Sequence, residues 1–148
     1  MKKILQGYSI VGLDNPKTHH NVGSAMRAVK IFSAEALFFT GRRYKSSSTD
    51  TMRANRYKPL IHVQNLRDIR AYNCIPVAVD LIEGATSIVD YKHPKRAFYI
   101  FGAEDATLGK KILSWCRDTI YIPTNGCMNL AAAVNVVLYD RSMKTLRK

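Results

Sequence analysis

The sequence predicts an α/β protein in which helices cover both faces of a parallel sheet, so that the fold has three layers. Short apolar runs alternate with segments of helical periodicity, as they do when a helix joins each parallel strand to the next. The run at residues 75–81 is apolar almost throughout, which is typical of strands buried on both faces. The chain has 148 residues, 47% of them hydrophobic, and residues 1–148 are expected to form a single domain.

The first half of the chain is predicted to alternate strands with helices. Tyr8–Leu13 is a short buried strand that ends at the turn residues 14–16. A helix is predicted next, because Val22, Met26 and Val29 recur at helical spacing. The expected elements are strands at Tyr8–Leu13, 36–40 and 60–63, and helices at 21–32 and 65–72.

The second half continues the alternation and ends in a long helix. Strands are expected at 75–81, Arg96–Phe101 and 119–122, a helix at 110–116, and irregular or edge structure at 86–91. Pro123 ends the last strand, and a loop containing Gly126 leads to Asn129, a favoured helix cap. The apolar stripe of the final helix consists of Leu130, Ala133, Val134, Val137 and Leu138.

The charge balance indicates a polyanionic partner. The chain has 23 Lys and Arg against 11 Asp and Glu, a net charge of +12, which favours nucleic acid over mere solubility. Residues 41–59 form a basic loop with Tyr44 and Tyr57 among the cations and a helical turn expected near Met52. Its candidate RNA-contacting residues are Arg42, Arg43, Lys45, Arg53 and Arg56; the alternative is a solvated surface loop.

Several familiar sites are excluded. The cysteines and histidines have no metal-ligand spacing and no disulfide framework, so no metal is expected and a reducing compartment is indicated. These residues are Cys74, Cys116, Cys127, His19, His20, His62 and His93. No glycine-rich dinucleotide motif or P-loop occurs. No signal-peptide core or membrane span is recognisable, so a cytoplasmic protein without a membrane partner is expected.

Polar motifs follow three of the predicted strands. The first strand is followed by Asn21-x-Gly23-x-x-x-Arg27, and Arg96–Phe101 runs into Phe101-Gly102-x-Glu104. The last strand leads from Ile122-Pro123 to Cys127-Met128-Asn129-Leu130. Ligands of open α/β sheets bind beyond the carboxyl ends of the strands, and glycines let a ligand approach the backbone. The three motifs therefore indicate one ligand site.

Together these motifs resemble those of the SpoU/TrmH branch of the SPOUT superfamily, the S-adenosylmethionine-dependent RNA ribose 2′-O-methyltransferases. The resemblance spans nearly the whole chain. The small size and the Met128-Asn129-Leu130 form of the third motif are most similar to the minimal subgroup, some members of which modify the tRNA wobble nucleotide. The resemblance implies a C-terminal deep trefoil knot, a homodimer, S-adenosylmethionine as cofactor, and RNA as substrate, tRNA ahead of rRNA.

The resemblance also implies roles for individual residues. Arg27 would anchor a phosphate and stabilise the emerging alkoxide, and Asn21 and Asn129 would orient Arg27 or the ribose. Glu104 would fix the active-site loop or pair with Arg27. The implied cofactor-binding residues are Val79, Asp80, Leu81, Phe101, Gly102, Ile122, Cys127, Met128 and Leu130.

Three positions depart from the family pattern. Thr107 stands where the family usually has Gly, Cys127 where it has Ser, and Ala131 where a small polar residue is usual. A thiol is a poor hydrogen bonder, so a directed contact is lost at Cys127. Two alternatives stay open: a non-catalytic RNA-binding module that keeps the fold, and a basic α/β enzyme for a small anionic substrate.

Overall fold

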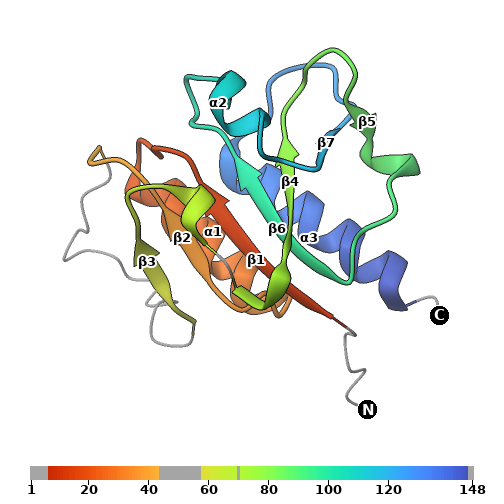
Figure 1. Ribbon diagram of the computed structural model, residues 1–148, viewed down its shortest axis with the longest axis horizontal. Coiled ribbons are helices and arrows are strands. Elements are labelled where there is room, and N and C mark those ends of the chain that lie inside the picture. Colours follow the sequence, from red (N-terminus) through yellow and green to blue (C-terminus); the bar gives the residue numbers. More distant parts are fainter. Residues whose placement is uncertain (1–6, 44–57, 70, 147–148) are drawn as a thin grey trace.

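The computed structural model of the chain describes residues 7–43, 58–69 and 71–146. Within these residues, seven parallel strands form one sheet in the order β3-β2-β1-β6-β4-β7-β5 (Figure 1). The strands are β1 (Tyr8–Leu13), β2 (Leu37–Phe39), β3 (Leu60–His62), β4 (Ile75–Val79), β5 (Thr86–Ser87), β6 (Arg96–Phe101) and β7 (Asp118–Tyr121). The parallel α/β fold predicted from the sequence is therefore confirmed.

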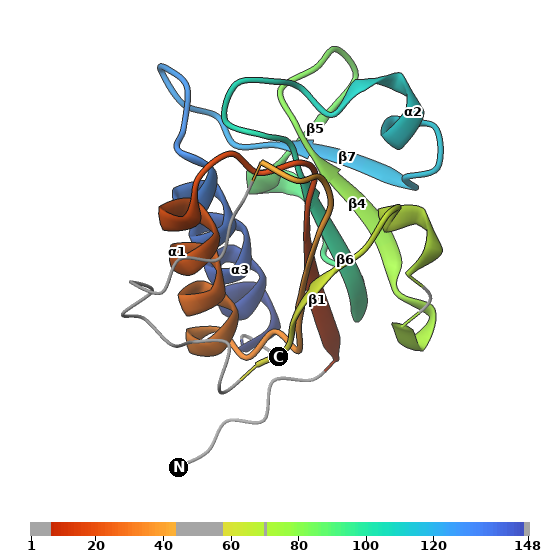
Figure 2. The same cartoon turned by 90° about the vertical axis from the view of Figure 1, so that its left-hand side faces the viewer.

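Helices cover both faces of this sheet (Figure 2). Helix α1 (His19–Ile31) and helix α3 (Leu130–Leu146) pack side by side on one face. The opposite face is covered by the short helix α2 (Gly109–Leu113) and by two 3-10 turns, η2 (Leu66–Asp68) and η3 (Ala71–Asn73). The three predicted layers are present.

The centre of the sheet is the pair β1 and β6, which are in register along their whole length. Side chains of a strand alternate between its two faces, so both strands supply two cores. Val11 and Phe101 face α1 and α3, whereas Ile10 and Ile100 face α2 and η2. All four are at most 2% exposed, which explains the near-continuous apolar runs in the sequence.

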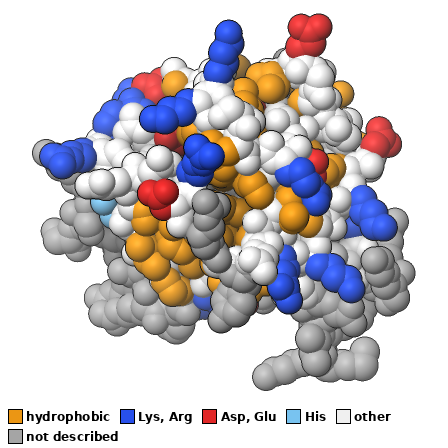
Figure 3. Space-filling model, in the orientation of Figure 1, with side chains coloured by type: hydrophobic (Ala, Val, Ile, Leu, Met, Phe, Trp, Pro, Cys, Tyr) orange, Lys and Arg blue, Asp and Glu red, His pale blue; other side chains and the backbone are white. Residues whose placement is uncertain are grey.

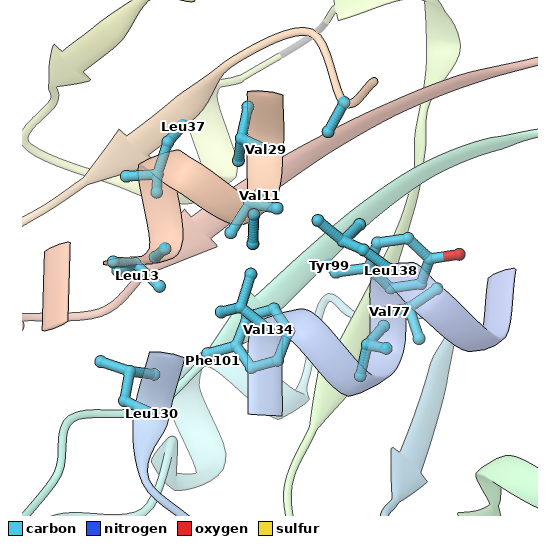
Figure 4. Close-up of a cluster of buried hydrophobic side chains, with 14 of the residues drawn as sticks. Val11, Leu13, Val29, Leu37, Val77, Tyr99, Phe101, Leu130, Val134 and Leu138 are labelled. Carbon is cyan, nitrogen blue, oxygen red and sulfur yellow. The ribbon is translucent and has the colours of Figure 1, made fainter. Parts of the chain in front are cut away.

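Helix α3 closes the larger core with its apolar stripe (Figure 4). Leu130, Val134 and Leu138 point at β1 and β6 and are between 0 and 5% exposed, as the spacing predicts. Truncating a buried leucine of this kind, as in Leu138→Ala, costs about 2–5 kcal/mol of unfolding free energy. The helix is therefore held by packing, and it carries its N-terminus to the strand ends of the sheet.

Helix α1 begins earlier than the apolar periodicity predicts. Thr18 is its N-cap: it has extended backbone angles, and its side-chain oxygen accepts from the backbone amide of Asn21 at 3.3 Å. Val22, the first buried residue of the helix, comes three positions after its start at His19, so hydrophobic periodicity alone placed the start too late.

The helix predicted at residues 65–72 is wrong. The chain forms η2 and η3 there instead, with Ile69 extended between them. The Asn65 side chain accepts from the Arg67 amide at 3.0 Å and caps a single turn. Leu66 is buried, and Ile69 and Ala71 pack against the same core although the chain is extended at Ile69, so burial of these residues does not require a continuous helix.

Two other expectations are adjusted. The helix predicted at 110–116 is shorter: after Leu113 the amides of Trp115 and Cys116 bond to carbonyls three residues back. The edge structure predicted at 86–91 is β5 beside β7, followed by the 3-10 turn η4 (Ile88–Asp90). The helical turn expected near Met52 falls outside the described residues. Among the helices that are described, none combines the length and the apolarity needed to cross a membrane.

Candidate active site

The register of the sheet brings the three motif-bearing strand ends together. Leu13 at the end of β1 pairs with Phe101 at the end of β6, and Phe101 pairs with Val79 of β4. Val79 in turn pairs with Ile120 of β7. The loops after β1, β6 and β7 therefore leave the same edge of the sheet, and their polar residues meet there.

A chain of hydrogen bonds joins the three motifs. The Asn21 side-chain amide donates to Oε1 of Glu104 at 2.6 Å, and Oδ1 of Asn21 accepts from the amide of Asn129 at 2.9 Å. Oδ1 of Asn129 accepts from the backbone amide of Ala132 at 3.1 Å and so caps α3. Each asparagine side chain thus donates through its NH₂ group and accepts through its Oδ1, which fixes the orientation of the amide.

Glu104 is held as a carboxylate. Its Oε2 accepts from the backbone amide of Lys17 at 2.9 Å, in the loop that precedes α1. Partial burial raises the pKa of Glu104, but the hydrogen bonds from Asn21 and from backbone amides outweigh it, so the pKa lies below its ordinary value. Glu104 is therefore ionised at neutral pH and positions Asn21 and the loop before α1.

Arg27 lies apart from this hydrogen-bond chain. It is exposed on α1 and makes no hydrogen bond or ion pair with any other residue in the described part of the chain. Of the two arrangements expected for Glu104, the structure shows the contact with the loop and with Asn21, and the Glu104–Arg27 pair is not formed. Among the described residues, none pairs with this guanidinium, which is exposed toward solvent and accessible to an anion.

Two adjoining cavities open beside the three motifs. The larger, of about 540 Å³, is lined by the ends of β4 and β7 and by the loop that precedes α3. The smaller, of about 150 Å³, reaches Phe101, Gly102 and Leu130, and shares Val79, Asp80 and Met128 with the larger. The residues expected to bind the cofactor all line one cavity or the other: Val79, Asp80, Leu81, Phe101, Gly102, Ile122, Cys127, Met128 and Leu130.

The loop at residues 102–108 forms the wall between these cavities and the opposite face of the sheet. A Cβ placed on Gly102 would lie 3.0 Å from the Ala106 carbonyl oxygen, so the loop folds tightly onto this glycine. The Asp80 carboxylate accepts from the Leu108 amide at 3.1 Å and ties the far end of the loop to β4. Asp80 therefore shapes the wall as well as lining both cavities.

The positions that depart from the family pattern differ in their surroundings. Cys127 lines the larger cavity and is exposed. Thr107 is exposed and lines neither cavity, while Ala131, in the first turn of α3, is buried at 5% exposure. Of the three, Cys127 is the one placed to touch a ligand in these cavities.

The predicted RNA-contacting residues fall into two groups. Arg42 and Arg43 are described and exposed, whereas Lys45, Arg53 and Arg56 lie outside the described residues. Arg43 forms a bidentate ion pair with Asp105, at 2.8 and 3.0 Å, and also donates to the Asn15 carbonyl at 2.8 Å. The Arg43 hydrogen bond is the main cause of the lowered pKa of Asp105. Arg43 thus ties the basic segment to the loop at 102–108.

Some site residues had no usable signal in the sequence. Lys17 contributes a backbone amide, and Thr124 donates its hydroxyl to the Gly126 carbonyl at 2.6 Å, which shapes the loop lining the larger cavity. Backbone contacts of this kind leave no residue-type pattern. Among the residues that the structure describes, there is no group of three or more His, Cys, Asp or Glu side chains that could hold a metal ion.

A parallel α/β sheet with three polar motifs around a strand-end crevice is the arrangement of a ligand-binding α/β protein. The chain belongs to the SpoU rRNA Methylase family, which matches it over residues 8–139. The resemblance drawn from the sequence motifs is therefore confirmed.

Individual relatives agree with this assignment. The chain is 28% identical to the 23S rRNA (guanosine-2'-O-)-methyltransferase RlmB of Acinetobacter baylyi, over 93% of this chain and 60% of that protein. Its fold matches the SpoU methyltransferase AviRb from Streptomyces viridochromogenes in complex with AdoMet, with a TM-score of 0.80, 20% identity, and coverage of 96% and 59%. It also matches the A. aeolicus TrmH/SpoU tRNA modifying enzyme, with a TM-score of 0.80, 20% identity, and coverage of 97% and 80%. The chain thus spans about 60% of the length of the curated relative and of AviRb.

Proposed function

We propose that this chain transfers a methyl group from S-adenosylmethionine to a ribose 2′-hydroxyl of RNA. The observation that carries the proposal is the Glu104–Asn21–Asn129 hydrogen-bond chain beside a cavity of about 540 Å³. A cavity of this size is in the range of small-ligand sites. The relative named as a 23S rRNA (guanosine-2'-O-)-methyltransferase and the SpoU methyltransferase AviRb in complex with AdoMet support the same chemistry.

The cofactor is proposed to lie across the two adjoining cavities. Met128 and Leu130 offer apolar surface for the adenine, and the backbone at Gly102 and Ile122 offers polar groups at close approach. S-adenosylmethionine supplies a methyl group on a positively charged sulfur. The residues of this chain hold the ribose oxygen in line with that group, and such positioning supplies much of the rate of a displacement.

Arg27 is proposed to bind the RNA rather than to take the proton. Guanidinium groups keep their charge in proteins, so arginine is a poor general base. An exposed guanidinium is suited to bidentate binding of a phosphate next to the target ribose, and its charge stabilises the oxygen as the proton leaves. Asn21 and Asn129, whose amides are fixed by their neighbours, are proposed to orient the ribose.

The RNA is proposed to be tRNA ahead of rRNA. The support is the similarity to the minimal subgroup together with the structural likeness to a tRNA modifying enzyme, while the curated relative acts on 23S rRNA. Transfer of tritiated methyl groups to bulk tRNA and to bulk rRNA, followed by mapping of the methylated nucleotide, tests the choice. Label in rRNA alone would overturn it.

Calorimetric titration with S-adenosylmethionine tests the enzyme against the non-catalytic module. Micromolar binding is expected for the enzyme, and the absence of binding supports a module that keeps only the fold. Absence of any RNA binding at low salt would instead favour an enzyme for a small anionic substrate.

We also propose that the chain forms a homodimer and that its C-terminal region is knotted. Tyr139 and Met143 on α3 are 54% and 36% exposed, and Ile31 at the end of α1 is 59% exposed. Apolar side chains gathered on neighbouring helices are typical of a subunit interface. Sedimentation equilibrium tests the dimer: a monomer at micromolar concentration would contradict it.

A further inference from the structure

A third cavity lies on the face of the sheet opposite α1 and α3. It has a volume of about 330 Å³ and opens between η2 and α2. Figure 3 views this face and shows hydrophobic side chains at its centre with Lys and Arg side chains around them. The cavity shares no lining residue with the two cavities proposed for the cofactor. It is therefore a separate site.

The cavity combines an aromatic ring, two cations and several hydrogen-bonding groups. Trp115, half-buried, lines the cavity together with Lys111 and Arg67, which are exposed and form no ion pair with other residues in the described ranges. Asp14, Thr40 and Asn65 lie at the carboxyl ends of β1, β2 and β3 and line the inner side. Strand ends of an open α/β sheet are where ligands of this fold bind.

The polar groups of the inner side are held in place and still have bonding capacity. The Thr40 hydroxyl donates to Oδ1 of Asp14 at 3.1 Å, and Oδ2 of Asp14 makes no hydrogen bond within the described residues. Oδ1 of Asn65 is taken by the Arg67 amide, so the Asn65 side chain can still donate through its NH₂ group. An acceptor and a donor that line the same cavity suit the hydrogen-bonding edge of a nucleobase.

We propose that this cavity binds one unpaired nucleotide of the RNA, separate from the nucleotide that is methylated. The base lies against Trp115 with its edge toward Asp14 and Asn65, and the flanking phosphates meet Lys111 and Arg67. Stacking on an aromatic ring is worth about 1–3 kcal/mol per base in single-strand binding proteins. The proposal rests on the proposed function in that it takes RNA as the partner.

One loop connects this cavity to the proposed methyl-transfer site. Leu108 lines the third cavity, and its backbone amide bonds to Asp80, which lines both cofactor cavities. The loop at 102–108 is thus the wall between the two sites, and it also contains Glu104. A single RNA strand crossing this loop would reach both sites.

The test uses two lysines that are adjacent in α2. Lys111 lines the cavity and Lys110 does not, while both are exposed, so Lys111→Gln and Lys110→Gln change the net charge equally. Binding of a fluorescently labelled single-stranded RNA is measured by anisotropy at several salt concentrations. Trp115 is the single tryptophan of the chain, so its fluorescence reports on the cavity directly.

The expected result is that RNA quenches Trp115 fluorescence and that Lys111→Gln weakens RNA binding several-fold. The slope of log K against log salt is expected to fall by about 0.7 in Lys111→Gln, the value for one phosphate contact with a single strand. Lys110→Gln should weaken RNA binding less than Lys111→Gln does, because Lys110 does not line the cavity. Equal effects of the two variants, or saturating RNA without any change in Trp115 fluorescence, would overturn the proposal.

Two further binding measurements distinguish the possible outcomes. Nucleoside monophosphates are titrated alone, and quenching by them without quenching by RNA would assign the cavity to a free nucleotide and overturn the proposal. Affinity for S-adenosylmethionine is measured on the same variants and should be unchanged. If the wild-type protein does not bind S-adenosylmethionine, the proposed enzyme function is refuted. An RNA contact that depends on Lys111 would still establish this site in that case.

Discussion

Asn129 and Asn21 are 108 positions apart in the chain, and the side-chain amide of Asn129 donates to Oδ1 of Asn21 at 2.9 Å. The same Asn129 caps α3 through its Oδ1. One side chain therefore performs two tasks with two different atoms. This division makes the stability role and the proposed active-site role of Asn129 separable by mutation.

Asn129→Asp is expected to keep the cap and lose the contact with Asn21. A carboxylate caps a helix as well as an amide does, but it has no donor for Oδ1 of Asn21. We expect thermal stability close to wild type and methyl transfer reduced at least tenfold. Asn129→Ala should lose both, with about 1 kcal/mol less unfolding free energy from the missing cap. Full activity in the aspartate variant would show that the Asn21 contact is dispensable.

Arg27→Ala is expected to abolish methyl transfer without weakening the binding of the cofactor. Within the described residues Arg27 makes no hydrogen bond or ion pair that the alanine would remove, so stability and affinity for S-adenosylmethionine should stay near wild type. Arg27→Lys should recover only part of the activity, because an ammonium is a point charge and cannot bind a phosphate bidentately. Tritiated methyl transfer measures the effect, and unchanged turnover of the alanine variant contradicts the proposed role.

Gly102→Val is expected to eliminate cofactor binding. Its Cβ would lie 3.0 Å from the backbone carbonyl of Ala106, so the loop at 102–108 must shift and the smaller cavity is filled. Thr107→Val is the control in the same loop, because Thr107 is exposed and lines neither cavity. Calorimetry with S-adenosylmethionine compares the two, and retained micromolar affinity in Gly102→Val would refute this cofactor site.

The stability of the protein is expected to depend on His93 at mildly acidic pH. The His93 side chain is 1% exposed; its Nε2 bonds to Asp140 at 2.7 Å and its Nδ1 to the Tyr99 hydroxyl at 2.6 Å. The neutral ring satisfies both contacts, with Nε2–H donating and Nδ1 accepting. Burial lowers the pKa of His93 and outweighs the opposing effect of Asp140, while the positive charges of Lys144 and Arg141 lower it further.

The direction in which the unfolding free energy changes with pH follows from proton binding. The unfolded chain takes up a proton near pH 6.5 and the folded chain only at lower pH, so the unfolding free energy falls as the pH drops below about 6.5. Glu104, Asp105 and Asp118, whose pKa values are also lowered, contribute only at more acidic pH, below their ordinary values of 4.5 and 3.8. Urea unfolding of wild type and His93→Gln between pH 7 and about 5 measures the effect. If the unfolding free energy of His93→Gln falls with pH as steeply as that of wild type, another group causes the effect.

Much of the fold was predictable because its central strands, β1 and β6, are buried on both faces. The bounds of β1 and β6 agree with those predicted, since each run of apolar residues ends where the strand leaves the core. The stripe of α3 was predictable for the same reason. The segment at 65–72 was not: with only Leu66 buried in η2, local propensity and capping by Asn65 decide its conformation, and both favour single turns.

By itself the sequence determined the layers of the protein, the strands at its centre, and the three motifs at the strand ends. Only the tertiary structure decided which residues meet: Glu104 with Asn21 and Lys17, Asn21 with Asn129, and Arg43 with Asp105. Periodicity reports how each segment is buried, which is a local property. The partners of a polar side chain depend on sheet register and on loops from distant segments, so no local pattern specifies them.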